Sequence, residues 1–477
     1  MKILLTYSGT DKDFKNFEAV PPLGIVAVYS KLPAGVRDET YFLDGNLVGT
    51  GYIQDWIHRN KPKIVGIGAL TFGYQNAMEI GKAAKDSGAM VVLGGRHATD
   101  LRENILREMR LGTRPFDYLV SGEGESRFAQ MATTYLLNGS MPLLPNVFSR
   151  ASDLSSTAIP EVKFGIDTEF PVLDYSMLKG ESAPTEYMKK LGKIGLFKQI
   201  QISMPIITQR GCAYMGKAHC KFCSIPDVNP KIAYGTFEKS LENLVKQTQA
   251  DHVWITEGTF TSNLNHMREV AKRVRTVKER TGKDFMFYCF ARADNLLRDG
   301  VINTLKDMNV KQVFVGYEHA DNDLLVKMQK NTTEEENLAA TIKLDEAGIE
   351  VPCAGLVLGT PPETRATLQK TVDFARKLSG IGNVRSIFAS PVYPFSGAPY
   401  WPEFLGALEQ ADSGFAKYLR NTDILPEELL VEQFHRVAHL MPGGSRQEDR
   451  PTLDEILETR KRINEILGQG IEFSATS

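Results

Sequence analysis

Residues 199–227 read QIQISMPIITQRGCAYMGKAHCKFCSIPD, and we expect this stretch to decide how the second half of the chain folds. The apolar run at 199–209 predicts a buried strand, and a loop follows it directly. That loop contains Cys212, Cys220 and Cys223, three of the five cysteines in the chain. Parallel α/β sheets and barrels build their sites in loops at strand ends. The stretch therefore predicts an α/β domain whose functional loop follows its first strand.

The alternation of strand and helix patterns continues to about residue 392. Five further strands are expected, at 252–256, 285–290, 312–317, 351–358 and 384–389. Helical patterns lie between and after them, near 236–249, 263–280, 295–308, 333–347 and 364–379. With the strand before Cys212 this makes six strand-helix units, too few to close an eight-fold barrel. We therefore expect a partial (β/α)6 barrel over 200–402 and a helical C-terminal domain over 403–477 that caps the barrel mouth.

A second α/β domain is predicted in front of the barrel, over residues 1–149. Its apolar runs are bounded by glycine and lie at 3–7, 41–43, 64–69, 90–93 and 118–120. Amphipathic helical patterns lie near 23–32, 51–59, 74–87, 100–110 and 125–137. Strands that are apolar on both faces indicate a parallel sheet covered by helices, as in a doubly wound Rossmann-like domain. Residues 150–199 lose the alternation and contain several prolines, which predicts a linker that wraps the surface.

Three glycine-rich loops follow strands of the first domain. They read GALTFGYQN at 68–76, GGRHAT at 94–99 and SGEGES at 121–126. Doubly wound sheets bind ligands at the carboxyl ends of their strands, and glycine lets the backbone come close to a ligand. None of these loops has a G-x-G-x-x-G or Walker spacing. They favour a large ligand that is not a simple dinucleotide.

Composition restricts the partners that we expect for the chain. The 477 residues carry a formal net charge of -2, with Lys and Arg spread along the sequence. This gives no electrostatic signature of nucleic acid or anionic membrane, so we expect a small-molecule substrate. Met1 leads into a short apolar run that stops at Gly9, too short for a membrane span or a signal peptide. We expect a cytoplasmic protein in which Cys289 and Cys353, in apolar runs, are buried structural thiols.

The crowded cysteines favour metal ligation in a reduced compartment over disulfide bonds. Spacings of seven and two residues let three thiolates bind three irons of one 4Fe-4S cluster. The fourth iron then keeps an open site for the amino and carboxylate groups of S-adenosylmethionine, whose carbon-sulfur bond an electron from the cluster breaks. The alternative is a zinc site completed by His219, since three cysteines and a histidine also bind zinc. His219 could instead cap or pack the loop.

Phe222, directly before the last cysteine, resembles the C-x-x-x-C-x-Φ-C signature of radical S-adenosylmethionine enzymes. The first spacing is seven residues instead of three, because AYMGKAH lengthens the loop. The resemblance continues through the strand ends ITEGTF at 255–260, FARADNL at 290–296, GYEHAD at 316–321, GLVLGTPPET at 355–364 and PVYPFSGAPYW at 391–401. It implies that S-adenosylmethionine is bound by Phe222, Glu257, Gly258, Arg292, Glu318 and Gly359.

The first domain resembles the amino-terminal cobalamin-binding domain of cobalamin-dependent radical enzymes. The resemblance rests on PPLG at 21–24, GGRHAT at 94–99 and GEGE at 122–125. None of the eight histidines lies in a D-x-H-x-x-G motif, so no motif histidine is expected at the lower face of the cobalt. The residues that the resemblance implies for cobalamin binding are Leu70, Thr71, Phe72, Tyr74, Gly94, Gly95, Arg96, His97, Gly122, Glu123 and Gly124.

Together the resemblances imply a cobalamin-dependent radical enzyme with a 4Fe-4S cluster, S-adenosylmethionine and cobalamin as cofactors. A flavodoxin-like or ferredoxin-like electron donor is expected. The leading hypothesis is a methyltransferase acting on an unactivated carbon of a small metabolite or natural-product intermediate. A second hypothesis keeps both cofactors without methyl transfer, as in rearrangement, ring contraction or heteroatom exchange. A third is a non-catalytic protein that binds cobalamin and holds zinc or a fully ligated cluster.

Overall fold

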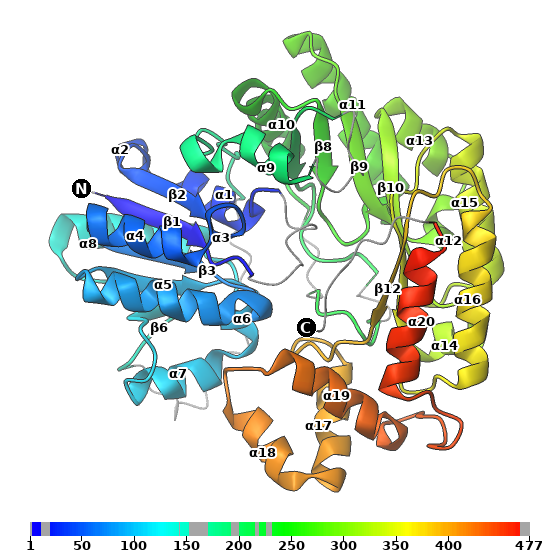
Figure 1. The fold of residues 1–477 in the computed structure, drawn as a ribbon. Coiled ribbons are helices and arrows are strands. Elements are labelled where there is room, and N and C mark those ends of the chain that lie inside the picture. Colours follow the sequence, from blue (N-terminus) through cyan, green and yellow to red (C-terminus); the bar gives the residue numbers. More distant parts are fainter. Residues whose placement is uncertain are drawn as a thin grey trace.

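The computed structural model describes residues 2–10, 20–142, 144–151, 170–191, 200–214, 219–225 and 231–467. The described chain contains two six-stranded sheets, one in each of the two large domains. Figure 1 shows the first domain in blue and cyan, the second in green and yellow, and the orange helices α17–α19 below both. The α/β fold class predicted from the sequence is confirmed.

The sheet of the first domain has the strand order β2-β1-β3-β4-β5-β6. Five strands are parallel, and β6 pairs antiparallel with β5 at one edge. Every residue of β1 and β3 is buried, as expected for strands covered on both faces. The strands are β1 (Ile3–Tyr7), β2 (Thr40–Asp44), β3 (Ile64–Gly68), β4 (Met90–Gly94), β5 (Tyr118–Val120) and β6 (Val147–Ser149).

Helices cover this sheet on both faces. Helices α1 and α8 pack against each other on one face, where Val26 and Phe128 join the core that contains Leu5. Helices α4 and α5 pack together on the other face, where Ile53 and Ala77 join a second core. The helices are α1 (Leu23–Lys31), α2 (Ala34–Arg37), α3 (Gly45–Val48), α4 (Thr50–Asn60), α5 (Tyr74–Asp86), α6 (Arg96–Asp100), α7 (Arg102–Arg110) and α8 (Glu125–Asn138), with η2 (Thr71–Gly73) before α5.

The second sheet is a partial barrel whose strands follow one another in sequence order from β7 to β12. All neighbouring pairs are parallel, and β7 and β12 form the two edges. The strands are β7 (Ser203–Ile206), β8 (His252–Ile255), β9 (Met286–Ala291), β10 (Val310–Glu318), β11 (Ala354–Leu358) and β12 (Ile387–Pro391). The helices are α10 (Tyr234–Thr248), α11 (Leu264–Thr281), α12 (Ala293–Leu296), α13 (Val301–Asp307), α14 (Asn322–Lys327), α15 (Glu334–Glu346) and α16 (Arg365–Ser379), with η5 (Phe260–Ser262) after β8.

The two faces of the barrel sheet differ in their exposure. Val253 and Phe287 are fully buried in the core beneath the surrounding helices. On the same strands, Trp254 and Phe290 alternate with them and are half-buried, as is Phe314 on β10. The ring of Phe290 lies edge-on to both Trp254 and Phe314, at centroid separations of 5.7 and 5.3 Å. The inner face of the partial barrel therefore carries a row of contacting aromatic rings.

The linker between the domains contributes to the core, in contrast to the surface path expected from its sequence. Its described part contains η3 (Gly180–Ser182) and α9 (Pro184–Leu191). Tyr175 and Tyr187 are 1% and 0% exposed. Tyr187 donates a hydrogen bond to Asp44 at 2.8 Å, and Tyr175 donates to the carbonyl of Pro205 at 2.7 Å. The linker thus ties the end of β2 and the strand β7 together.

The predicted helical C-terminal region is confirmed, and it joins the two domains. Phe404 and Phe434 of this region share a buried core with helices of the first domain. Helix α20 instead packs along β12 and α16 (Figure 1). The helices are α17 (Tyr400–Ala411), α18 (Ser413–Asn421), α19 (Glu427–Val437) and α20 (Leu453–Glu465), with η6 (Ala438–Leu440) after α19.

Asp423, between α18 and α19, forms the main polar contact of this region with the first domain. Its carboxylate accepts hydrogen bonds from the Tyr74 hydroxyl at 2.7 Å and from Arg114 Nη2 at 2.6 Å. His97 Nε2 lies 2.9 Å from the Asp423 carbonyl oxygen. The guanidinium beside Asp423 helps to hold the pKa of that carboxyl below its usual value despite burial. Burial lowers the pKa of His97 to about 4, so this imidazole is neutral at pH 7.

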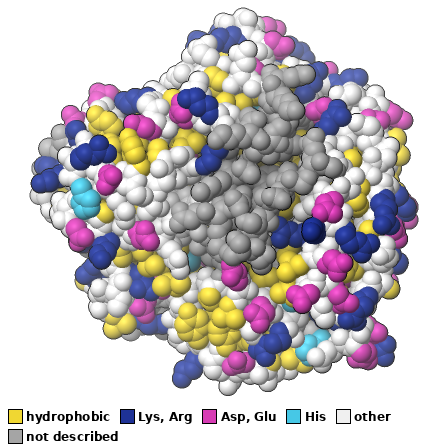
Figure 2. Space-filling model, in the orientation of Figure 1, with side chains coloured by type: hydrophobic (Ala, Val, Ile, Leu, Met, Phe, Trp, Pro, Cys, Tyr) yellow, Lys and Arg dark blue, Asp and Glu magenta, His cyan; other side chains and the backbone are white. Residues whose placement is uncertain are grey.

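The surface seen in Figure 2 mixes charges of both signs. Lys and Arg side chains alternate with Asp and Glu over the described part of this face. This distribution agrees with the formal net charge of -2 for the whole chain. No helix among the described residues is long and apolar enough to cross a membrane.

Candidate functional site

A cavity of about 650 Å³ lies at the carboxyl ends of the strands of the first domain. Leu5, Val92 and Phe128 line its deep part, on the face of the sheet that α1 and α8 cover. The loops after β3, β4 and β5 line its upper part. Pro205, Ile207, Arg210, Gly211 and Thr256 close it from the side of the barrel. The cavity is therefore shared between the two domains.

Glycines give this cavity its room. An added Cβ at Gly94 would meet no atom within 4 Å, so this position faces open space. At Gly66, deeper in the sheet, a Cβ would come within 2.7 Å of the Phe128 ring. Gly95 has a φ of +99°, a conformation that other residues rarely adopt. An apolar slot below a glycine-rich rim fits a bulky ligand with a flat apolar tail, and cobalamin has this character.

The predicted cobalamin-binding residues divide into two groups. Those that line the cavity are Leu70, Gly94, Gly95, Arg96, Gly122, Glu123 and Gly124. Tyr74 and His97 are instead 2% and 1% exposed in the core and contact Asp423. Thr71 lies 3.3 Å from His97 Nδ1, and the Phe72 ring packs against Tyr393 and Phe395. These four residues thus make their contacts outside the cavity lining. That Thr71, Phe72, Tyr74 and His97 bind cobalamin stays a prediction.

The cysteine loop begins where β7 reaches this cavity. Cys212 and Cys220 are each 8% exposed, and burial raises the pKa of Cys223 to about 12. The charges of Cys212 and Cys220 further disfavour a thiolate at Cys223, so the three sulfurs lie within electrostatic range of one another. Burial also raises the pKa of the Cys220 thiol, while Lys330 and Arg292 favour its thiolate. Three buried cysteines beside two cations fit a ligand set that ionises when iron binds, with its negative charge balanced by iron and by the protein.

His219 contacts the backbone of the same loop. Its Nε2 atom lies 2.7 Å from the carbonyl oxygen of Cys223, where it can donate a hydrogen bond. This contact agrees with the capping role considered for His219. Among the described residues, no three Cys, His, Asp or Glu side chains converge as ligands of a single metal ion. A cubane differs from such a site, because each of its three cysteines binds a separate iron.

Glu257 and Gly258 follow β8 and adjoin the start of the cysteine loop. A Cβ at Gly258 would lie 2.9 Å from Ile225 Cδ1 and 3.3 Å from Cys212 Cβ, so glycine here lets the cysteine loop pack closely against the turn after β8. Glu257 is 2% exposed and accepts hydrogen bonds from the Thr208 hydroxyl at 2.9 Å and the Gln209 amide at 2.8 Å. Burial raises the pKa of Glu257 to about 8. The Glu257 side chain therefore fixes the backbone that leads into the cysteine loop.

Arg292 follows β9, and Glu318 belongs to β10. Both lie near the same cysteines. Arg292 Nη2 donates to the Lys330 carbonyl at 2.6 Å, and its guanidinium stacks over the Tyr214 ring at 3.6 Å. Glu318 has a φ of +66° and pairs with Lys330 at 2.9 Å. A glutamate in this left-handed region costs energy, which is typical of functional sites. Lys330 and Tyr214 are site residues that the sequence analysis missed, because no motif marks them.

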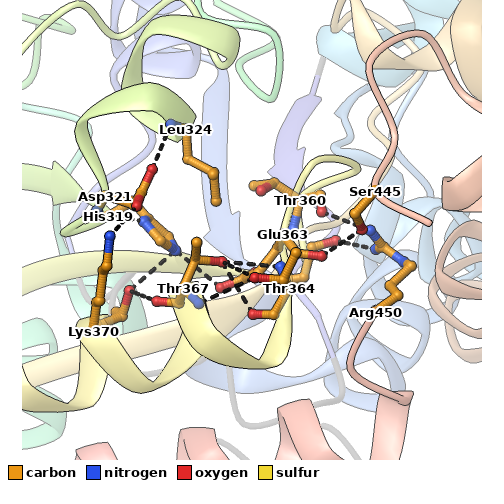
Figure 3. A network of polar contacts seen from close by, with 12 residues as sticks. His319, Asp321, Leu324, Thr360, Glu363, Thr364, Thr367, Lys370, Ser445 and Arg450 are labelled. Atoms are coloured by element: carbon orange, nitrogen blue, oxygen red, sulfur yellow. Dashed lines mark hydrogen bonds and ion pairs between the residues drawn. The ribbon is translucent and has the colours of Figure 1, made fainter. Parts of the chain in front are cut away.

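Gly359 and Glu363 form a turn after β11. Figure 3 shows the Glu363 carboxylate between His319 and the backbone of this turn. His319 Nε2 lies 2.9 Å from Glu363, and Arg450 donates to the carbonyls of Gly359 and Thr360, each at 2.9 Å. Gly359 has a φ of +77°, and a Cβ there would clash with the ring of His435. The glycine is therefore required by the turn and by the close approach of α19.

Phe222, the remaining predicted residue, lies in the described end of the cysteine loop and packs on the core shared with α17 and α19. Arg210 and Glu125 line the cavity but were not predicted. The signal in the sequence that could have identified Arg210 was its position next to the cysteine loop. Glu125 belongs to the GEGE motif, where only the first three residues were assigned to the ligand.

Two protein-family profiles match the sequence. Residues 206–375 match the Radical SAM superfamily, and residues 18–132 match the B12 binding domain. The first match contains the three cysteines and the predicted residues for S-adenosylmethionine. The second contains the glycine-rich loops of the cavity. The chain therefore carries a radical S-adenosylmethionine domain and a cobalamin domain.

Similar proteins support the same organisation. The Uncharacterized methyltransferase PH0819 of Pyrococcus horikoshii is 24% identical over 423 residues, which cover 84% of this chain and 82% of that protein. The structure of the cobalamin-dependent S-adenosylmethionine radical enzyme OxsB with aqua-cobalamin and S-adenosylmethionine bound matches with a TM-score of 0.60 at 14% identity, over 86% of this chain and 61% of OxsB. OxsB with aqua-cobalamin bound matches with a TM-score of 0.56 at 15% identity, over 88% and 56%. This chain thus spans about three fifths of the OxsB chain, with which it shares its fold.

Proposed function

We propose, from the premise that this chain is a cobalamin-dependent radical S-adenosylmethionine enzyme, that it is a C-methyltransferase. It would methylate an unactivated carbon of a small metabolite or natural-product intermediate. The observation that carries the proposal is the shared cavity, which the glycine loops of the first domain and Ile207 and Thr256 of the barrel line together. Gly211 and Thr256 of this lining adjoin the cysteine loop and the turn after β8, so both cofactors would bind around one space between the domains. The name of the Pyrococcus relative as a methyltransferase supports the choice of reaction.

The cluster and S-adenosylmethionine would bind at one end of this space. When bound, the reduced cluster supplies the electron that yields a 5'-deoxyadenosyl radical, and cobalamin supplies the methyl group. Cys212, Cys220 and Cys223 would hold the cluster. Gly258 lets the turn after β8 approach Cys212 closely, and Arg292 would orient the carboxylate of S-adenosylmethionine. The Nε and Nη2 atoms of Arg292 are engaged by Asp294 and Lys330, so the fork is held in place before a ligand arrives.

The inner face of the barrel supports radical chemistry on an apolar part of a substrate. Trp254, Phe290 and Phe314 form its half-buried aromatic row. Apolar rings exclude water, which limits side reactions of a reactive intermediate. The row would therefore hold the substrate carbon in a dry environment. The enzyme also needs a reductant, for which we propose a flavodoxin-like or ferredoxin-like protein.

Isotope transfer tests the reaction. The reconstituted enzyme would be incubated with methyl-deuterated S-adenosylmethionine, a strong reductant and a metabolite extract, and products would be surveyed by mass spectrometry. We expect the deuterated methyl group in a new product with the wild-type enzyme and not with Cys223→Ala. Formation of 5'-deoxyadenosine and an unlabelled product would instead support rearrangement, ring contraction or heteroatom exchange. If the chain binds zinc instead of iron, the result would support a non-catalytic binding protein.

A further inference from the structure

Arg210 connects the cysteine loop to the first domain. It lies two residues before Cys212, and its guanidinium forms ion pairs with Glu123 and Glu125. The bond from Nη2 to Glu125 Oε1 measures 2.5 Å. Both glutamates belong to the glycine-rich loop after β5, and all three residues line the shared cavity. One side chain therefore joins the rim of the cobalamin cavity to the first cysteine.

The contact is enclosed, so solvent screens its Coulomb attraction less than that of a surface ion pair. The side chains of Arg210, Glu123 and Glu125 are 16%, 10% and 10% exposed. The guanidinium also stacks over the ring of Phe170 from the linker, at 4.8 Å. Burial lowers the pKa of Arg210 to about 10, which still leaves it charged at pH 7. Loss of one partner of such a pair leaves a buried charge uncompensated.

The same backbone is held from the opposite side by the barrel. Glu257 accepts hydrogen bonds from Thr208 and from the amide of Gln209. Gly211, with a φ of +69°, then turns the chain toward Cys212. The segment from Thr208 to Gly211 is thus fixed between a buried carboxylate of the barrel and two carboxylates of the cobalamin domain. Any displacement of the loop after β5 would be transmitted to Cys212 through Arg210.

Charge is also unbalanced at this contact. Two carboxylates face one guanidinium, and Glu123 Oε2 has no partner among the described residues although it is buried. Glu123, Glu125 and Arg210 all line the cavity. A ligand that packs on this rim would therefore restrict the loop to the conformation in which both carboxylates hold Arg210.

We propose that Arg210 is a positioning residue that couples cobalamin binding to the cluster loop through Glu123 and Glu125. This inference rests on the proposed function, because it assumes that both cofactors bind. Coupling between two sites is reciprocal, so a loaded cluster must strengthen cobalamin binding by the same factor as cobalamin strengthens cluster binding. Arg210 does not contact the reacting atoms; its role is to hold Cys212 in position.

The test measures hydroxocobalamin affinity in the full chain with and without the cluster. Wild type, Arg210→Gln, Arg210→Lys and the control Arg385→Gln would be titrated anaerobically and followed by visible absorption. Arg385 forms an exposed ion pair with Glu350, so the control makes the same substitution outside both sites. We expect the loaded cluster to tighten hydroxocobalamin binding by at least about tenfold (about 1.4 kcal/mol) in wild type and in the control. Arg210→Gln should abolish that difference.

Arg210→Lys should restore part of the difference, because lysine keeps the charge but lacks the planar fork that spans two carboxylates. Glu125→Gln provides a second, isosteric variant with the same expected loss if Arg210→Gln does not fold. An equal cluster effect in wild type and Arg210→Gln, or no cluster effect in wild type, would overturn the inference. Failure of wild type to bind iron or hydroxocobalamin at all would instead refute the proposed function.

Discussion

Replacing Glu257 by Gln should remove a pH dependence that this buried carboxyl gives to the stability of the barrel. Burial raises the pKa of Glu257 from 4.5 to about 8. A folded-state pKa above the unfolded value means that the folded state binds the proton more tightly. The contribution to stability is then fully present below about pH 4.5 and is lost as the pH rises through about 8. One pH unit within this window corresponds to about 1.4 kcal/mol, so the full range is roughly 5 kcal/mol as an upper bound.

The assay is the thermal unfolding midpoint of the metal-free chain between about pH 5 and 9. We expect the midpoint of Glu257→Gln to fall less with rising pH than that of wild type, because the amide keeps the shape and does not ionise. Glu257→Ala should be less stable at every pH, since the unpaired Gln209 amide costs about 1–3 kcal/mol, while the Thr208 hydroxyl keeps His266 Nε2 as a partner at 2.7 Å. Equal pH slopes for wild type and Glu257→Gln would refute the raised pKa.

Two further predictions concern the first domain. Gly94→Leu should fold normally, because a side chain at this position meets open space. By filling the cavity rim, it should weaken hydroxocobalamin binding at least about tenfold. An unchanged affinity would place the ligand elsewhere. Asp423→Asn should lower the free energy of unfolding by about 3 kcal/mol, because it leaves the Arg114 guanidinium without its buried partner. Urea denaturation would measure this loss, and an unchanged midpoint would contradict the role of Asp423 in holding the C-terminal helices to the first domain.

The sequence predicted the strands closely because parallel strands buried on both faces are continuous apolar runs. The runs at Ile3–Tyr7 and Tyr118–Val120 coincide with β1 and β5, and the remaining predicted strands differ from the observed ones by a few residues. Strand β6 was missed, since three half-buried residues at an antiparallel edge leave no recognisable period. The linker was predicted at the surface because the burial of Tyr175 and Tyr187 depends on partners in both domains.

The glycine-rich loops and the cysteine loop were predictable because the residues of each loop are adjacent in sequence. Tyr74 and His97 were assigned to cobalamin from the resemblance of their loops to those of cobalamin-binding domains. The structure directs both toward Asp423, a residue more than 300 positions away that sequence patterns cannot pair with them. The ion pairs of Arg210 with Glu123 and Glu125 were missed for the same reason. Local motifs thus identify ligand loops, while contacts between domains require the fold.

The most direct test of the account is anaerobic cleavage of S-adenosylmethionine. Wild type and Cys223→Ala would be reconstituted with iron, sulfide and hydroxocobalamin, given a strong reductant, and assayed for 5'-deoxyadenosine. We predict release by wild type and none by Cys223→Ala, because one iron of the cluster loses its protein ligand. Release by neither protein, despite a full iron content in wild type, would contradict the radical mechanism.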